Sequence, residues 1–375
     1  MKDEWMTCEE VAELEGISVR AVQARCARKT LPCKKIGGVW KINRLEYEHQ
    51  KGKFLVTQKK QILKSENSTV KSALVFANAK GGVGKTTLSV VTADKLSLLG
   101  YKVLLVDMDP QGNATTFAGL QPYRGTGRPG NGEYKEALHD VLLGQVFELF
   151  GMENKIRTRD AIYPARGFYV LPTDNRAERI KYWLLDNAHA FSTGMDLYNV
   201  WTEHFPFLLK NALKEVEKDF DFFIIDTPPE MGWATTNAMM CATDIVIPIE
   251  LGNFEVAGLE MVFTFIDQCA VKNPKLKILG IVISRYGPHR SRLDIDLEDQ
   301  LRKHEIWGPF VFQTIIYRTL LVREATNAYK SVFEYWRKGM SRDSLQSLDE
   351  FTDELIMKLI LNNKGLDNIE AGEKL

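Results

Sequence analysis

The feature that most constrains this chain is a glycine-rich loop between a predicted buried strand and a predicted helix. Residues 73–77 form a continuous apolar run of strand length, and residues 88–99 have a helix-forming composition that ends at Gly100. The loop between them reads Lys-Gly-Gly-Val-Gly-Lys-Thr-Thr over residues 80–87. Glycines let backbone N–H groups approach phosphate oxygens, and a helix N-terminus favours negative charge. The segment predicts a nucleoside triphosphate site, because its strand and helix context argues against a chance glycine-rich turn.

The loop also carries the side chains that such a ligand needs. Lys85 is expected to reach the β and γ phosphates, and Thr86 to ligate Mg²⁺. The predicted ATP-binding residues are Lys80, Gly81, Gly82, Val83, Gly84, Lys85, Thr86 and Thr87.

Two further apolar runs of strand length end in acidic residues. Residues 102–106 lead into Asp107 and Asp109, and residues 222–225 lead into Asp226. Taken alone, an Asp-x-Asp after a strand is more often a turn and helix cap. Ligands of open α/β sheets bind at the carboxyl ends of the strands, so the place of this pair after the glycine-rich loop favours a functional role.

The remaining pattern predicts the fold class. Apolar runs at residues 245–249 and 278–283 add core strands, and helical segments alternate with the strands. This order predicts an α/β protein with a doubly wound, mostly parallel sheet.

The start of the loop departs from the general P-loop, which has glycine at the position of Ala79. The sequence Lys80-Gly81-Gly82 instead resembles the deviant P-loop of the ParA/MinD family of ATPases, and the resemblance extends over residues 72–360. It implies an ATPase with ATP and Mg²⁺ as cofactors, in which Lys80 crosses a dimer interface to the partner's nucleotide. The resemblance implies catalytic roles for Lys80, Lys85 and Asp109, of which Asp109 positions the attacking water. It implies metal binding by Thr86, Asp107 and Asp226. Asp107 would also belong to the switch network, and Asp226 would act through the water shell of Mg²⁺.

Residues 1–52 have a different character. Thr7 and Glu10 form a capping box, Ser18 caps a second predicted helix, and a Gly-Gly turn joins two short strands within residues 34–42. Residues 17–60 hold twelve basic and two acidic side chains. The segment resembles the winged helix-turn-helix of MerR-like and excisionase-like DNA-binding domains, although a helical hairpin with a solvated basic face is the alternative. The DNA-contact candidates are Ser18, Arg20, Gln23, Arg25, Arg28, Lys34 and Lys35.

Basic residues also gather in the C-terminal half, where the family binds DNA non-specifically in its ATP-bound dimer. Arg285, His289, Arg290 and Arg292 lie close together in sequence, and the candidates for phosphate contact are Arg290, Arg292, Arg318 and Arg323. Each of these arginines has a solvated surface position as its alternative.

Composition narrows the class of protein. The 49 basic residues balance the 49 acidic ones, so no global positive field draws the chain to nucleic acid. The five cysteines are scattered and follow no zinc or iron–sulfur spacing, which favours a reducing cytoplasm. Residues 343–375 hold eight acids and three lysines, unlike the basic membrane helix of MinD-like relatives, so no membrane partner is expected.

The sequence therefore predicts a winged helix-turn-helix domain over residues 1–52, a linker over 53–71, a ParA-type ATPase domain over 72–363 and an acidic tail over 364–375. The function implied by the resemblance is partition of a plasmid, phage-plasmid or chromosome by a homodimer on the nucleoid. Its implied partners are DNA, a ParB-like centromere-binding protein that triggers hydrolysis, and its own operator. The alternatives are a nucleotide-controlled transcription regulator and a cargo-positioning ATPase of the same fold.

Overall fold

In the computed structural model the chain divides into two units, residues 1–68 and 69–375. The described residues are 5–15, 18–27, 31, 33–43, 72–122, 132–149, 151–154, 156–178, 180, 182, 200–252, 255–286, 291–335 and 342–363.

The N-terminal unit contains two helices and a three-stranded sheet. The helices are α1 (Cys8–Glu15) and α2 (Val19–Ala27), and the sheet has the order β1 (Trp5–Met6), β3 (Val39–Asn43), β2 (Cys33–Ile36). The capping box is present, since Glu10 N donates to Thr7 Oγ1 at 3.1 Å and Thr7 N donates to Glu10 Oε2 at 2.7 Å. Gly37 and Gly38 have φ values of 58° and 83°, which suits the two-residue turn between β2 and β3.

The larger unit is built on an eight-stranded sheet. From one edge to the other the strands are β13 (Val311–Tyr317), β12 (Lys277–Tyr286), β11 (Asp244–Ile249), β4 (Ser72–Phe76), β10 (Phe222–Asp226), β5 (Val103–Asp107), β9 (Tyr169–Leu171) and β8 (Tyr163–Pro164). Neighbouring strands are parallel except for β8, which runs antiparallel to β9. The predicted doubly wound, mostly parallel α/β sheet is confirmed.

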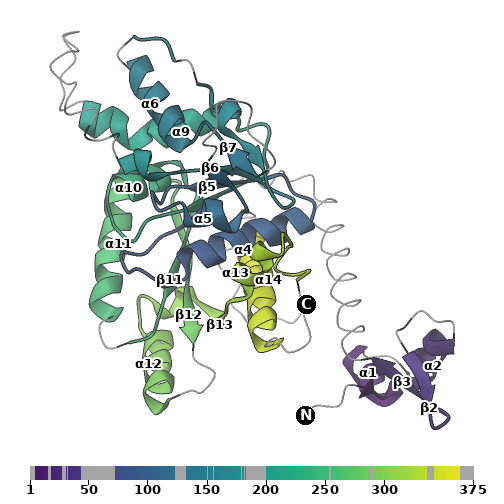
Figure 1. The fold of residues 1–375 in the computed structure, drawn as a ribbon. Helices are drawn as coiled ribbons and strands as arrows, with labels where there is room; N and C mark the ends of the chain where they lie inside the picture. The colour runs from purple at the N-terminus through teal and green to yellow at the C-terminus, as the bar shows by residue number, and fades with distance from the viewer. Residues whose placement is uncertain are drawn as a thin grey trace. The chain divides into compact units, whose positions relative to one another are not determined.

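Helices cover both faces of the sheet (Figure 1). One face carries α4 (Lys85–Leu98), with α13 (Leu321–Asn327) and α14 (Arg342–Asn363) each packed against it, while α5 (Asn113–Phe117) packs beside α4. The other face carries α6 (Leu138–Leu149), α9 (Leu208–Lys214), α10 (Trp233–Cys241) and α11 (Glu255–Lys272). The strands between them are almost wholly apolar because both of their faces are buried.

Short elements complete the unit. They are α12 (Arg292–Lys303), a two-stranded pair of β6 (Gln121–Pro122) and β7 (Glu133–Tyr134), the 3-10 turns η1 (Thr158–Ala161), η2 (Asn175–Glu178), η4 (Phe205–Phe207) and η5 (Gly308–Phe310), and a π-helical turn η3 (Val200–His204). Within the described part of the chain, no helix combines the length and apolar character needed to cross a bilayer.

Candidate nucleotide site

The glycine-rich loop joins β4 to the N-terminus of α4, as the sequence predicts. Gly82 and Gly84 have φ values of 77° and 93°, in the region that L side chains rarely adopt, and Gly84 is the N-cap of α4. The Lys85 side chain is 6% exposed, and its Nζ donates to the carbonyls of Asn78 at 3.0 Å and Lys80 at 2.9 Å. Burial lowers the pKa of Lys85, while the charges of Asp226 and Asp109 act in the opposite direction. The loop therefore presents a curved backbone and a buried cation at a helix N-terminus.

The predicted acids meet at the same edge of the sheet. Asp226 of β10 lies in register with Asp107 of β5 and with Phe76 of β4, the strand that leads into the loop. Asp107 and Asp226 are fully buried, and Asp109 is 7% exposed. The charges of Asp226 and Asp109 thus act on Lys85, and Asp107 lies in register with Asp226 where the parallel strands end.

Asp226 has an acceptor atom that the protein does not satisfy. Its Oδ1 accepts from Ser89 Oγ at 3.2 Å, but among the described residues its buried Oδ2 has no hydrogen-bond partner. Burial and the nearby charge of Asp107 raise the pKa of Asp226 well above its usual range, and the Thr86 hydroxyl acts in the opposite direction. A buried, unpartnered carboxylate oxygen next to a threonine hydroxyl fits a hard cation such as Mg²⁺, which prefers oxygen ligands.

Asp107, in contrast, is already engaged by its own chain. Its Oδ2 accepts from the Thr115 backbone N and hydroxyl, each at 2.8 Å, and its Oδ1 accepts from Asp109 N at 3.2 Å. Burial raises the pKa of Asp107 to about 7, against the effect of the Thr115 hydrogen bonds. These contacts favour the switch part of the role predicted for Asp107 over direct metal ligation.

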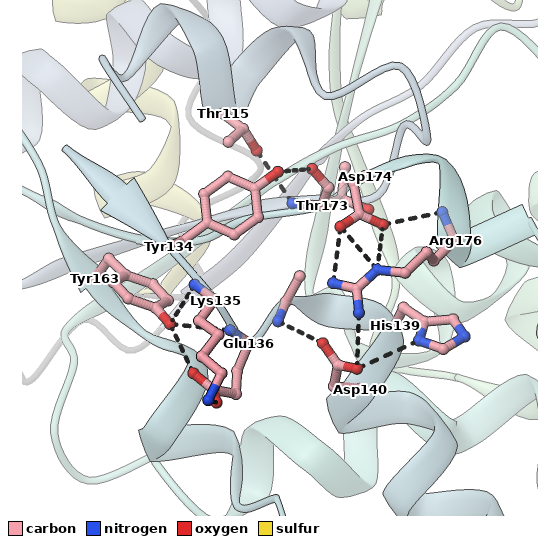
Figure 2. A network of polar contacts seen from close by, with 11 residues as sticks. Thr115, Tyr134, Lys135, Glu136, His139, Asp140, Tyr163, Thr173, Asp174 and Arg176 are labelled. Atoms are coloured by element: carbon pink, nitrogen blue, oxygen red, sulfur yellow. Dashed lines mark hydrogen bonds and ion pairs between the residues drawn. The ribbon is translucent and has the colours of Figure 1, made fainter. Parts of the chain in front are cut away.

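A polar network continues from Thr115 into the segment before α6 (Figure 2). Thr115 Oγ1 accepts from Thr173 N at 3.1 Å, and Tyr134 donates its hydroxyl to the Thr173 carbonyl at 2.9 Å. Beyond Thr173, Arg176 Nη2 lies 2.8 Å from Asp174 Oδ2 and its Nη1 lies 3.1 Å from Asp140 Oδ1. The end of β5, α5 and the segments around α6 are therefore linked by hydrogen bonds.

Asp109 and Lys80 differ in solvent exposure: Asp109 is buried and Lys80 is exposed. Asp109 Oδ1 accepts from Gln111 N at 3.0 Å, which fixes the turn after β5. Lys80 is exposed, and its backbone N donates to Asn78 Oδ1 at 3.0 Å. The exposed lysine at the mouth of the loop is compatible with the crossing role that the resemblance implies.

The DNA-contact candidates fall on several elements. In the N-terminal unit, Ser18 caps α2 with its Oγ 3.3 Å from Ala21 N, and the exposed ammonium groups of Lys34 and Lys35 lie over the rings of Trp5 and Trp40. Arg20 and Gln23 are exposed on α2 and Arg25 is partly exposed, whereas Arg28 lies outside the described residues.

The C-terminal candidates are not on one element. Arg292 is the exposed first residue of α12, Arg323 is exposed on α13, and Arg318 follows β13 with its Nη2 3.8 Å from Glu250 Oε1. Arg290 lies outside the described residues.

Two residues at the end of β12 contact the loop, and the sequence did not assign them to the nucleotide site. Ser284 donates its hydroxyl to the Val83 carbonyl, and Arg285 Nη1 donates to the Gly82 carbonyl at 2.5 Å. Arg285, grouped by sequence with Arg290 and Arg292, is separated from Gly82 by 203 positions. Only the pairing of β12 within the sheet brings these segments together.

A glycine-rich phosphate loop at the edge of a parallel sheet, with acids at the ends of the adjacent strands, defines a P-loop nucleoside triphosphatase. The sequence profile of the AAA domain family matches residues 71–278. The chain is 30% identical over 263 residues to the chromosome-partitioning ATPase Soj of Thermus thermophilus, covering 70% of this chain and 87% of Soj. The chain belongs to this family of ParA/Soj partition ATPases.

Solved structures agree on the fold. The McdA–ATP complex from Cyanothece matches with a TM-score of 0.57 and 21% identity, covering 76% of this chain and 96% of McdA. The cobyrinic acid a,c-diamide synthase of Mycobacterium smegmatis, with ADP and magnesium bound, matches with a TM-score of 0.55 and 24% identity, covering 79% of this chain and 96% of the synthase. One fold thus carries different chemistries, so function depends on the site.

Proposed function

We propose that this chain is a partition ATPase that binds Mg²⁺ and ATP at the loop over residues 80–87, dimerises on ATP and hydrolyses it slowly until a partner stimulates turnover. The observation that carries this proposal is the meeting of buried Lys85, the N-terminus of α4 and the Asp226 oxygen that lacks a hydrogen-bond partner among the described residues, all at one edge of the sheet. That combination suits a triphosphate with its cation.

The residues divide the work at this site. On nucleotide binding, Lys85 Nζ turns from the Asn78 and Lys80 carbonyls to the β and γ phosphates. Thr86 and Asp226 would hold Mg²⁺, which would neutralise charge on the phosphates. Asp109 orients the attacking water, while Asp107 couples the end of β5 to α5 through Thr115.

Lys80 provides the link between hydrolysis and assembly. It is exposed at the start of the loop, so in a face-to-face dimer it can reach the nucleotide of the second copy. A cation supplied in trans would stabilise the charge of the transferring phosphoryl group only in the dimer. Turnover by a single copy is therefore slow.

DNA binding is proposed at two places with different selectivity. Arg290, Arg292, Arg318 and Arg323 contact phosphates without reading sequence, which would hold the ATP-bound dimer on the nucleoid. The N-terminal unit, with exposed Arg20 and Gln23 on α2 and Lys34 and Lys35 on β2, contacts the operator of its own gene. The partner that stimulates hydrolysis is a ParB-like centromere-binding protein.

The N-terminal unit supports a second candidate function. In a nucleotide-controlled transcription regulator, ATP would set the DNA-binding state and its turnover would be incidental. An Asp109→Ala chain that still segregates its replicon normally would favour this regulator. Loss of segregation with operator binding retained would favour the partition ATPase.

Steady-state ATP turnover by the full chain tests the proposed function. We expect slow turnover alone, and an increase when non-specific DNA and the product of the adjacent reading frame are added together. Lys85→Ala should abolish turnover in every mixture. If neither addition changes the rate of wild-type turnover, the proposal that a partner controls ATP hydrolysis is contradicted.

A further inference from the structure

Residues at the carboxyl end of β12 form hydrogen bonds with the glycine-rich loop. Ser284 is 2% exposed, and its hydroxyl lies within hydrogen-bond distance of the Val83 carbonyl and, at 3.0 Å, of the Ile249 carbonyl. The next residue, Arg285, donates from Nη1 to the Gly82 carbonyl. Two consecutive carbonyls of the loop are thus held by two consecutive residues of one strand, called here the β12 pair.

This contact fixes the direction of the loop's N–H groups. In a planar trans peptide the C=O and N–H bonds point to opposite sides. Because the Gly82 and Val83 carbonyls point toward the β12 pair, the N–H groups of Val83 and of Gly84, the N-cap of α4, point away from it. Successive N–H groups that face one concavity form an anion site.

The backbone of Arg285 is strained, and its guanidinium group lies close to Gly82. Arg285 has φ 56°, a left-handed conformation that is uncommon for a residue with a long side chain. A Cβ at Gly82 would lie 2.7 Å from Arg285 Nη1, and one at Gly84 would lie 3.6 Å from Ser284 Oγ. Strained residues that persist are often found where function requires the geometry.

We infer that Ser284 and Arg285 are positioning residues for the nucleotide: they preorganise the Val83 and Gly84 N–H groups for the phosphates of ATP and ADP without contacting the nucleotide themselves. The inference rests on the proposed nucleotide site. Since both nucleotides carry the phosphates next to the ribose, loss of the β12 pair weakens both. The effect falls on binding and not on the chemical step, because the cradle serves ground state and transition state alike.

Calorimetric titration of the full chain with Mg²⁺–ADP and with a non-hydrolysable Mg²⁺–ATP analogue tests this. For Arg285→Ala we expect Kd to rise roughly tenfold for both ligands, the loss of about one hydrogen bond. In turnover, KM should rise by a similar factor while kcat stays within about twofold. Ser284→Ala should act in the same direction, and Arg285→Lys should recover part of the affinity because its ammonium can still donate to the carbonyl.

Arg285→Gly separates positioning from a general structural role. Glycine relieves the left-handed φ, so this variant should unfold at a higher temperature than Arg285→Ala yet bind both nucleotides equally weakly. Arg159→Ala, which removes an exposed arginine paired with Asp219, serves as the control and should bind as wild type.

Three outcomes would overturn the inference or its basis. Arg285→Ala with wild-type affinity for both ligands would show that the contact does not position the loop. Weakening for the ATP analogue alone would replace positioning by a direct contact of Arg285 with the γ phosphate. A wild-type chain that binds neither ligand would overturn the proposed function itself.

Discussion

At the scale of single residues, Asp94 is a buried acid within α4. Asp94 is fully buried on this helix, and its Oδ2 accepts from Ser331 Oγ at 2.9 Å and Val332 N at 2.7 Å. Its Oδ1 has no hydrogen-bond partner among the described residues. Burial raises the pKa of Asp94 to about 6, although these hydrogen bonds and the charge of Arg166 oppose the shift. The carboxyl group of Asp94 therefore joins α4 to residues 331–332, and its raised pKa favours the protonated form.

Asp94 predicts a pH dependence of stability. A raised carboxyl pKa means that the folded state binds more protons, so the free energy of unfolding should fall as pH rises between about 4 and 6. The loss from this group approaches about 3 kcal/mol at most. Denaturant unfolding of wild type and Asp94→Asn across pH 4–7 measures it. The stability of wild type relative to Asp94→Asn should decrease over this range, and parallel profiles would contradict the assignment.

Thr115 gives a second prediction at this scale. Thr115→Val keeps the shape of the side chain but removes the hydroxyl that donates to Asp107 and accepts from Thr173 N. We expect the free energy of unfolding to fall by about 1–3 kcal/mol because buried polar groups lose partners. Thr116→Val, an exposed change on the same helix, is the control. Equal stability of the two variants in denaturant unfolding would show that the network adds nothing.

Among the secondary-structure elements, α14 protects an edge of the sheet. Among the described strands β13 pairs only with β12, and its Gln313 and Thr314 N–H groups donate to the two oxygens of Glu354 on α14, at 2.8 and 2.9 Å. Such covering blunts a strand edge that could otherwise pair with another chain.

Glu354→Gln should weaken this cover. One carboxylate oxygen is replaced by an amide nitrogen, which cannot accept a hydrogen bond. We therefore expect a loss of about 1–3 kcal/mol in stability and a greater tendency to aggregate on heating. Glu350→Gln, one turn away where Glu350 contacts Gln346, should change stability by less than about 0.5 kcal/mol. Thermal unfolding with light scattering distinguishes them; indistinguishable curves would argue against the cover.

The elements also show what the sequence could predict. Five core strands were predictable because they are continuous apolar runs buried on both faces. Strand β13 was not identified, since Gln313 and Thr314 interrupt its apolar pattern where α14 covers it, and β8 and β9 are too short to show a period. The P-loop and its acids could be placed from local motifs. The contact of Arg285 with Gly82 could not, because it depends on long-range strand order.

The whole molecule combines opposed charges in a neutral chain. The formal net charge is +0, while residues 17–60 are strongly basic and residues 343–375 are acidic. Bulk charge therefore provides no general attraction to DNA, and any contact must be local. The proposed ATP-dependent dimer would bring two copies of each weak basic site together, which would let a neutral chain bind DNA conditionally.

Light scattering of the full chain with Mg²⁺ measures whether ATP controls the proposed assembly through Lys80. We expect the apparent mass to double with ATP and not to double with ADP. We expect Lys80→Ala, shown by titration to bind ATP, to stay at the mass of one chain. A Lys80→Ala chain that dimerises on ATP as fully as wild type would contradict it.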